Sequence, residues 1–217
     1  MGKPYVIVYS TMTIDGRIAS KTGFSRLSCP YDLRRLHSVR ASSDAVIVGA
    51  NTVIVDDPLL TVRYVEGRNP IRVIIDGVLR TSPNARVYNT LDQAKTMVYT
   101  SRIADKEKKR VLLEKGVEVI EIAEKPPLDM EVVLRDLYRR GIRRVLVEGG
   151  GRTTWFFISR RLVDELRITI SPYIFGNGVN IVDGEGFNDL SDAVSFRLVN
   201  IEICKCGREV HLKYLSD

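Results

Sequence analysis

The stretch DMEVVLRDLYRRGIRRVLVEGGGRTTWFFISRRL, residues 129–162, contains a helical pattern, a strand pattern and a glycine-rich turn in that order. Its first part, residues 129–140, repeats apolar side chains at helical spacing, with arginines on the opposite face. Asp129 is suited to cap the start of this helix, and Gly141 is suited to cap its end. The apolar run Arg144–Val147 then predicts a buried strand, from which three glycines lead into another apolar segment. Alternating helices and strands are typical of an α/β fold.

Short apolar runs rich in β-branched residues recur along the chain and predict strands that are buried on both faces. These runs are residues 5–9, 45–48, 71–75, 97–99, 117–122, 144–147 and 166–170. Helical patterns at residues 32–43 and 105–115 separate several of them, and residues 196–202 and 209–214 predict a hairpin. The predicted fold is a single α/β domain over residues 1–217, with a mainly parallel central sheet flanked by helices and an antiparallel C-terminal hairpin.

The composition excludes several classes of protein. A chain of 217 residues, 44% apolar and 28% charged, suits an ordinary globular domain. No apolar run approaches the roughly 18 residues of a membrane span. The apolar run near the N-terminus is short, and no small-residue cleavage site follows it. We therefore predict a cytoplasmic protein without a membrane partner.

The three cysteines, Cys29, Cys204 and Cys206, are too few for a disulfide framework. Cys204 and Cys206 lie two apart on a predicted strand, where their side chains would share one face. The only histidines are His37 and His211, so further metal ligands are scarce. We predict ordinary half-buried thiols and no metal site.

Three glycines, Gly149, Gly150 and Gly151, follow the strand predicted at residues 144–147 and precede an apolar segment. Glycines at such a turn let the backbone approach a ligand closely, and the start of the following helix favours an anion. The turn matches neither GxGxxG nor GxxxxGK[ST]. A tight turn that binds nothing is therefore an open alternative.

Thr100 and Ser101, followed by Arg102, come directly after the strand predicted at residues 97–99. Ligands of open α/β sheets bind at the carboxyl ends of the strands. Small hydroxyl groups beside an arginine could receive a 2′-phosphate, which favours NADPH over NADH. Plain capping of the next helix is the alternative.

The stretch GANTVIVDDPLLTVR, residues 49–63, follows the strand predicted at residues 45–48. About one helical turn would place Thr52 and Asp56 on one face, and the Asp-Asp-Pro sequence would end that turn. The extended chain that follows would direct Leu60 and Arg63 at a ligand. Adjacent carboxylates are costly in a core, so we expect them at the rim of a cleft, with capping of a turn as the alternative.

These motifs together resemble one family, the riboflavin-pathway reductases that act on a diamino-ribosylamino-pyrimidinone 5′-phosphate. The motifs that carry the resemblance are STMTIDGR at residues 10–17, the stretch at residues 49–63, EGG at residues 148–150, and SP at residues 171–172 with Gly176. Members have a fold similar to dihydrofolate reductase. The zinc deaminase motifs of bacterial relatives are absent from the sequence, so the chain resembles the stand-alone archaeal or fungal type, with no deaminase domain.

The resemblance implies a homodimeric enzyme that transfers hydride from NADPH to C1′ of the opened ribose imine. The apolar run at residues 155–158 is in keeping with a partner subunit. The cofactor would be held by Thr52, Thr100, Ser101, Gly149, Gly150, Gly151, Arg152 and Thr153. The substrate would be bound by Ser25, Arg40, Asp56, Leu60, Arg63 and Glu148. Asp56 and Glu148 are the candidate catalytic residues, because opening of the ribose ring requires proton movement.

Two other interpretations stay open. A pterin-type or dihydrofolate reductase of the same fold is one, although the arginine of residues 49–63 suits a phosphorylated sugar. A basic nucleic-acid-binding protein is the other, because 33 bases against 27 acids give a net charge of +6. The bases are scattered and accompany no recognised binding motif, so we expect a phosphorylated pyrimidinone as partner and no nucleic acid. We also expect the turns at Thr52 and Gly150 to form two walls of one crevice.

Overall fold

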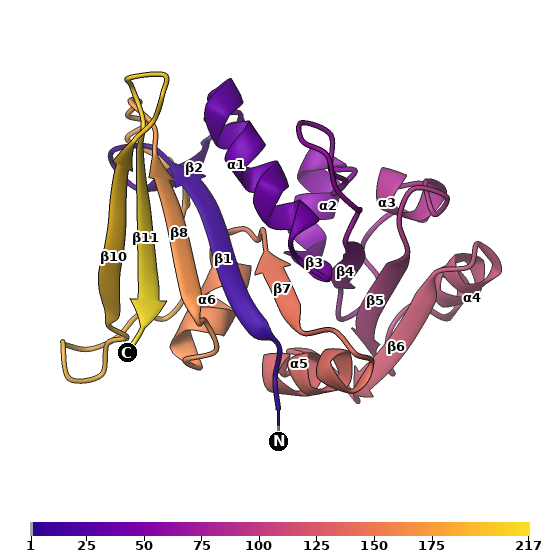
Figure 1. Cartoon of the computed structure of the whole chain (residues 1–217). Helices are drawn as coiled ribbons and strands as arrows, with labels where there is room; N and C mark the ends of the chain where they lie inside the picture. The colour runs from indigo at the N-terminus through magenta and orange to yellow at the C-terminus, as the bar shows by residue number, and fades with distance from the viewer. Residues whose placement is uncertain (1) are drawn as a thin grey trace. The chain divides into compact units, whose positions relative to one another are not determined.

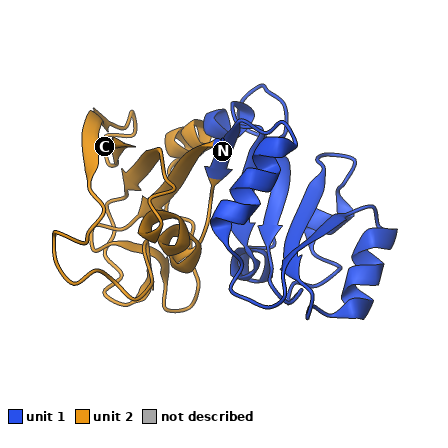
Figure 2. Cartoon of the chain, turned by 90° about the horizontal axis from the view of Figure 1, so that it is seen from below, with its two compact units in different colours: residues 1–4, 37–146 blue, residues 5–36, 147–217 orange. Residues whose placement is uncertain are grey.

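The computed structural model describes residues 2–217, and Figure 1 shows the order of its elements. The described residues group into two compact units (Figure 2). The first unit contains His37–Leu146 and the residues that precede Tyr5, and the second contains Tyr5–Leu36 and Val147–Asp217. Within the part of the chain that the structure describes, no helix is both long and apolar enough to cross a membrane.

A five-stranded arrangement forms the sheet of the first unit. Its order is β7 (Arg144–Val147), β3 (Ala45–Gly49), β4 (Ile71–Ile75), β5 (Thr96–Ser101) and β6 (Glu118–Ala123). The pairs from β3 to β6 are all parallel, as the apolar runs predicted. The expectation that every strand is buried on both faces fails in part for residues 165–170, three of which are half-buried, and it is wrong for β6, whose residues are only half-buried or exposed. It is the outermost strand of the sheet, so no neighbour covers its outer side.

The sequence pattern predicted three of the helices in the first unit, two of them to within one residue at each end, but it did not predict the short helix Arg86–Asn89. The helices of this unit are α2 (Ala50–Asp56), α3 (Arg86–Asn89), α4 (Lys106–Glu114) and α5 (Met130–Arg139). The carboxylate of Asp105 caps α4, and that of Asp129 caps α5 by accepting the backbone N–H of Glu131 at 2.8 Å. Gly116 and Gly141 follow these two helices at φ of +89° and +87°, a conformation that favours glycine.

The second unit carries the antiparallel part of the fold. Its larger sheet runs in the order β10 (Phe196–Ile203), β11 (Val210–Ser216), β8 (Glu165–Ile170) and β1 (Tyr5–Met12). The pair β1–β8 is parallel, whereas β8–β11 and β10–β11 are antiparallel, so the predicted C-terminal hairpin is confirmed. The short strands β2 (Arg17–Ser20) and β9 (Gly178–Asn180) form a separate pair.

Two helices complete the second unit. The helix α1 (Pro30–Ala41) begins in this unit, two residues before the predicted start, and its last residues belong to the first unit. The helix α6 (Gly151–Ser159) contains the apolar run, in which Trp155, Phe157 and Ile158 are each at most 9% exposed. Phe156 in the same run is half-buried. Most of the run is therefore covered within the chain, so it does not by itself indicate a subunit contact.

The predicted α/β fold, with a mainly parallel sheet and an antiparallel C-terminal hairpin, is thus confirmed. The interpretation of residues 1–217 as one reductase domain stays a prediction. The expectation that Cys204 and Cys206 lie on a strand is wrong, because both lie in the turn between β10 and β11. That turn brings the Sγ atom of Cys204 to 3.5 Å from the Sγ atom of Cys29.

Candidate active site

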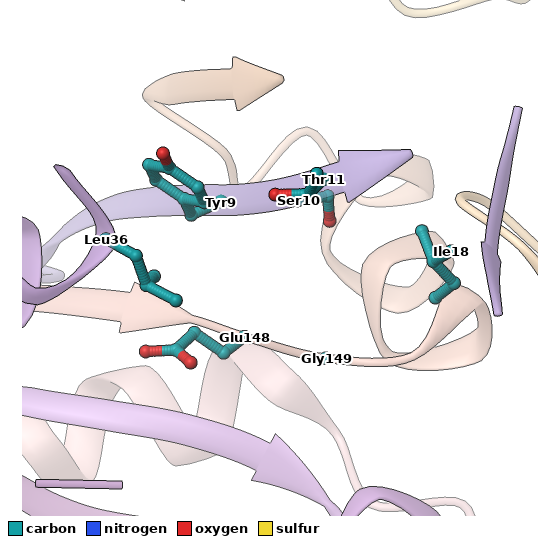
Figure 3. Close-up of a pocket in the computed structure, with 7 residues that line it drawn as sticks. All are labelled: Tyr9, Ser10, Thr11, Ile18, Leu36, Glu148 and Gly149. Atoms are coloured by element: carbon teal, nitrogen blue, oxygen red, sulfur yellow. The ribbon is translucent and has the colours of Figure 1, made fainter. Parts of the chain in front are cut away.

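A pocket of about 130 Å³ opens in the second unit, beside β1, β2, α1 and the turn after β7 (Figure 3). It is lined by Tyr9, Ser10, Thr11, Ile18, Leu36, Glu148 and Gly149. Glu148 and Gly149 were predicted from the sequence, whereas the other five residues were not. Ser10 and Thr11 nevertheless belong to the β1 motif that carried the family resemblance, so the motif itself was the available signal.

The three glycines after β7 differ in what surrounds them. A Cβ atom on Gly149 would lie 2.5 Å from the Cβ atom of Thr153, and one on Gly151 would lie 2.4 Å from the carbonyl oxygen of Asn180. A Cβ atom on Gly150, by contrast, would meet nothing within 4 Å. Gly149 and Gly151 are therefore required by packing inside the protein, whereas Gly150 leaves open space at the turn.

Gly150 is also the N-cap of α6, with φ of −68° and ψ of 171°. No side chain within residues 2–217 caps the helix, so its first N–H groups lack the usual side-chain acceptor. The nine-residue helix adds the positive end of its dipole at the same place. The open space and the helix start together can accept an anionic group such as a phosphate.

The wall of the pocket on β1 is fixed by the buried carboxylate of Asp32. Its Oδ1 atom accepts the hydroxyls of Tyr9 and Thr169 at 2.6 Å each, and its Oδ2 atom accepts the hydroxyl of Thr11 at 2.7 Å. Asp32 is fully buried, and burial together with the Asp32 charge raises the pKa of Tyr9. Tyr9 therefore stays protonated at neutral pH and donates to Asp32 rather than acting as a base.

Asp15, in the same β1 motif, has a structural role. Its carboxylate accepts the Thr13 hydroxyl at 2.6 Å and the backbone N–H groups of Phe175 and Gly176 at 3.2 and 2.7 Å. The bond from Thr13, followed by these backbone bonds, lowers the pKa of Asp15. The two motifs around Asp15 and Gly176 are thus parts of one anchored turn, which ties the end of β1 to the segment after β8.

The two carboxylates of the Asp-Asp-Pro sequence, those of Asp56 and Asp57, lie in different environments in the first unit. Thr52 is half-buried and Asp56 is exposed, and both lie on α2 four residues apart. The helix ends at Asp56, and Asp57 follows as its C-cap with φ of +38°. The Oδ1 atom of Asp57 accepts the backbone N–H of Arg86 at 2.8 Å. Asp57 therefore caps a turn, whereas Asp56 lies at the surface, as expected for a carboxylate outside the core.

The chain after α2 takes an uncommon backbone conformation at Leu60, which has φ of +56° and is 2% exposed. The buried guanidinium of Arg72 holds this region from β4. It donates to the carbonyl oxygens of Leu59 and Thr90 at 3.4 and 2.9 Å, and it also contacts the carbonyl oxygen of Ala94. Burial lowers the pKa of Arg72 to about 10, so it remains charged at neutral pH.

The two arginines that were predicted to bind a phosphate meet at one residue. Arg40 donates through Nη1 to the carbonyl oxygen of Thr61 at 3.0 Å, and Arg63 donates through Nη1 to the Thr61 hydroxyl at 3.0 Å. His37 completes the group, because its Nδ1 atom accepts the backbone N–H of Arg63 at 2.8 Å and its Nε2 atom lies 3.2 Å from Arg40 Nη1. The structure thus brings Arg40 and Arg63 together in the first unit.

His37 is neutral at physiological pH. Burial, and then the charges of Arg40 and Arg63, lower its pKa to about 4. Its ring also contacts that of Tyr64 edge-to-face, with centroids 4.6 Å apart. This environment leaves the two guanidinium groups as the positive charges of the cluster.

Thr100 and Ser101 lie inside β5 and are fully buried. The Ser101 hydroxyl donates to the carbonyl oxygen of Gly77 at 2.6 Å, and no partner of the Thr100 hydroxyl is found among residues 2–217. Arg102, which follows, pairs with Glu124 at 2.6 Å. The prediction that Thr100 and Ser101 hold a cofactor phosphate stays a prediction, and their hydroxyls do not reach the surface.

The remaining predicted residues are Ser25, Arg152 and Thr153, all in the second unit. Ser25 and Arg152 are exposed, and Thr153 packs against Gly149. Thr52 and Gly150 belong to different units, so the expectation that their turns form one crevice stays a prediction.

Among curated proteins, the chain is similar to 2,5-diamino-6-ribosylamino-4(3H)-pyrimidinone 5′-phosphate reductases. It is 41% identical to the one from Methanothermobacter thermautotrophicus, over 90% of this chain and 91% of the relative. It is 39% identical to the one from Archaeoglobus fulgidus, over 85% of this chain and 89% of the relative.

Among solved structures, the chain is similar to a diaminohydroxyphosphoribosylaminopyrimidine deaminase/5-amino-6-(5-phosphoribosylamino)uracil reductase from Thermotoga maritima. The TM-score is 0.81 at 31% identity, and the match covers 99% of this chain and 57% of the other. A second neighbour is RibD from Acinetobacter baumannii, with a TM-score of 0.83 at 26% identity, and here the match covers all of this chain and 59% of the other.

Residues 4–212 match the family described as the RibD C-terminal domain. This match confirms the resemblance to the riboflavin-pathway reductases that the motifs indicated. The chain belongs to the RibD C-terminal domain family.

Proposed function

We propose that this chain reduces 2,5-diamino-6-(ribosylamino)-4(3H)-pyrimidinone 5′-phosphate to the ribitylamino compound in riboflavin biosynthesis, with NADPH as the reductant. The observation that carries the proposal is the similarity to the reductase of Methanothermobacter thermautotrophicus over nine-tenths of both chains. We propose further that residues 1–217 act as a single reductase domain in the cytoplasm.

The glycine turn supports the cofactor assignment. The open space at Gly150 and the uncapped start of α6 fit a phosphate of a dinucleotide, and Arg152 adds a positive charge next to them. The proposed cofactor-binding residues are Thr52, Thr100, Ser101, Gly149, Gly150, Gly151, Arg152 and Thr153. When bound, NADPH would supply the hydride that reduces C1′. The choice of NADPH over NADH rests on the arginine that follows Thr100 and Ser101.

The arginine cluster supports the substrate assignment. Arg40 and Arg63 approach each other at Thr61, and guanidinium groups form paired hydrogen bonds with phosphate oxygens. We therefore assign the 5′-phosphate to these two residues. Ser25, Asp56, Leu60 and Glu148 would bind the remainder of the substrate.

A carboxylate near the ribose would assist ring opening, because the step transfers a proton from the exocyclic nitrogen of the ribosylamine to its ring oxygen. The alternative is that substrate groups and water move the proton while the carboxylates only bind hydroxyl groups. Glu148 lines the pocket, where its neighbours on β1 are held by Asp32. Asp56 is exposed on α2. Either side chain can relay the proton if it lies within hydrogen-bond reach of the ribose, so both are proposed as catalytic residues.

We propose that the enzyme is a homodimer that pairs through β10. This strand is the outermost of its sheet, and Ile201 and Ile203 on it are 60% and 73% exposed. Large apolar side chains on an exposed outer strand are typical of a surface that another chain covers. Light scattering should give twice the mass of one chain, and Ile201→Lys should reduce it to that of a monomer.

The function is tested by following NADPH oxidation with the enzymically prepared ribosylamino-pyrimidinone phosphate as substrate. Mass spectrometry of the product should show a gain of two hydrogens. Parallel reactions with NADH and with dihydrofolate test the cofactor preference and the pterin alternative. Oxidation with dihydrofolate, and none with the pyrimidinone, would overturn the proposal.

A further inference from the structure

Three cysteines and a glutamate converge in the second unit, apart from the residues that line the pocket. Cys29 precedes α1, whereas Cys204, Cys206 and Glu209 come from the turn between β10 and β11. One ligand atom from each of the four residues lies within 4.8 Å of the other three. Two segments about 175 residues apart in sequence therefore meet at four side chains that can all bind a metal ion.

We propose that Cys29, Cys204, Cys206 and Glu209 bind one Zn²⁺ ion, through three thiolates and one carboxylate. Zn–S bonds of about 2.3 Å in a tetrahedral site require sulfur atoms about 3.8 Å apart. The Sγ atoms of Cys29 and Cys204 lie 3.5 Å apart, close to that spacing and much longer than the roughly 2.0 Å of a disulfide bond. The pair is therefore already at the separation that a shared ion requires.

Glu209 supplies the fourth ligand. Its side chain belongs to a residue that is 3% exposed, and its Oε1 atom accepts the backbone N–H of Cys29 at 2.7 Å. Its Oε2 atom is buried and has no hydrogen-bond partner within residues 2–217. A buried carboxylate oxygen without a partner is costly, and coordination to a cation would satisfy it.

The surrounding backbone suits a thiolate site. The N–H of Asp32 lies 3.4 Å from the Sγ atom of Cys29, an outer contact that stabilises a metal-bound thiolate. Gly207, at φ of +71°, turns the chain directly after Cys206, and its N–H donates to the carbonyl oxygen of Cys204 at 2.8 Å. Lys205, between the two cysteines of the turn, is exposed and is not one of the proposed ligands.

The ligand set selects the metal and its role. Three thiolates favour Zn²⁺ over Mg²⁺ or Ca²⁺, which prefer oxygen ligands. All four positions of a tetrahedral site are supplied by the protein, which is typical of structural zinc. The ion would fasten the segment before α1 to the β10–β11 hairpin, and its loss would not remove any group proposed for the reduction.

The proposal is tested on the full chain purified without chelators. Elemental analysis should find about one zinc ion per chain. The metal-free protein, titrated with Co²⁺, should develop an intense thiolate-to-cobalt charge-transfer band together with the visible bands of a tetrahedral ion. Cys206→Ser should weaken the charge-transfer band, because one of the three thiolates that produce it is lost. It should also weaken Co²⁺ binding by more than roughly 100-fold, the largest loss expected when only an outer contact of a metal site is removed.

Two further variants sharpen the test. Glu209→Gln should weaken Co²⁺ binding while the charge-transfer band remains, because the three thiolates are retained. Lys205→Ala, in the same turn but not a ligand, should bind metal like the unmodified chain. Circular dichroism establishes that each variant is folded, and Cys29→Ser replaces Cys206→Ser if the latter is not.

Two results would overturn the proposal. One is a protein without zinc that also shows no charge-transfer band with Co²⁺. The other is a Cys29–Cys204 disulfide, found by peptide mass mapping under non-reducing conditions in protein that holds no metal. Both measurements use the unmodified chain, so they stand even if a variant does not fold.

Discussion

The Nδ1 atom of His37 accepts the backbone N–H of Arg63 at 2.8 Å. This bond fixes the start of the Arg63 side chain from α1, and it requires an imidazole whose Nδ1 is unprotonated. The other ring nitrogen, Nε2, lies 3.2 Å from Nη1 of the Arg40 guanidinium. A second proton would place a charged ring between two cations, so the geometry of the arginine cluster depends on His37 remaining neutral.

Stability should fall as the pH falls through the window set by His37. Its pKa is lowered to about 4 in the folded protein from an ordinary value of 6.5. Between these values the unfolded chain binds a proton that the folded chain does not, so the free energy of unfolding decreases towards low pH. His211, whose pKa burial also lowers, contributes with the same sign. Urea unfolding at several pH values between about 7 and 4.5 measures the slope.

His37→Asn is the matched variant for this prediction. The Asn carbonyl oxygen can still accept the N–H of Arg63, but the side chain does not titrate. The slope of the unfolding free energy against pH should decrease, by at most about 1.4 kcal/mol per pH unit for one proton. An unchanged slope would show that His37 titrates normally in the folded protein.

Arg63→Lys should raise KM for the phosphorylated substrate by roughly 10-fold to 100-fold, with a smaller effect on kcat. Lysine keeps the charge but cannot form the paired hydrogen bonds of a guanidinium to phosphate oxygens. Steady-state kinetics with the phosphorylated and dephosphorylated substrates separate the two contributions. A similar loss with the dephosphorylated substrate would argue against the phosphate assignment.

Gly150→Val and Gly151→Ala should have opposite signatures. The first places a side chain in open space and should weaken NADPH binding by about 10-fold or more, without lowering the unfolding temperature. The second forces a Cβ atom to within 2.4 Å of the Asn180 carbonyl oxygen and should destabilise the fold. Fluorescence titration with NADPH and thermal unfolding distinguish them. Unchanged cofactor affinity in Gly150→Val would refute the role of the turn.

Asp56→Asn should reduce turnover by about 100-fold or more, within the range for loss of a general acid or base. Asp57→Asn is the control in the adjacent position, because its amide oxygen can still accept the N–H of Arg86. Its turnover should be close to that of the unmodified chain. Single-turnover kinetics should locate the defect of Asp56→Asn in the reduction itself, and near-normal turnover in this variant would remove Asp56 from catalysis.

The parts of the fold that local patterns determine were predictable. The caps at Asp105 and Asp129 and the glycines after α4 and α5 act within a few residues, so the sequence marks them directly. Ser101 is a position where the local pattern predicted the wrong end of a strand. The apolar run predicted that the strand ends at Tyr99, but β5 extends to Ser101, whose buried hydroxyl donates to the carbonyl oxygen of Gly77.

Contacts between distant segments were not predictable. The pocket is lined by Leu36 from α1 and by Glu148 from the turn after β7. Neither local sequence indicates that these two segments are neighbours in the fold. The cysteines illustrate the same limit. Cys29 contacts Cys204 only because the β10–β11 turn folds back on the segment before α1, a consequence of the whole sheet order in the second unit.

The irregular segment after α2 is held at successive backbone atoms by side chains from elsewhere in the first unit. Arg72 binds the carbonyl of Leu59, Arg40 binds that of Thr61, and His37 binds the N–H of Arg63. The conformational entropy of this loop is therefore lost when the chain folds, not when a ligand arrives. A molecule that docks here would meet a surface that is already ordered, so its association should not carry the entropic penalty of ordering this loop.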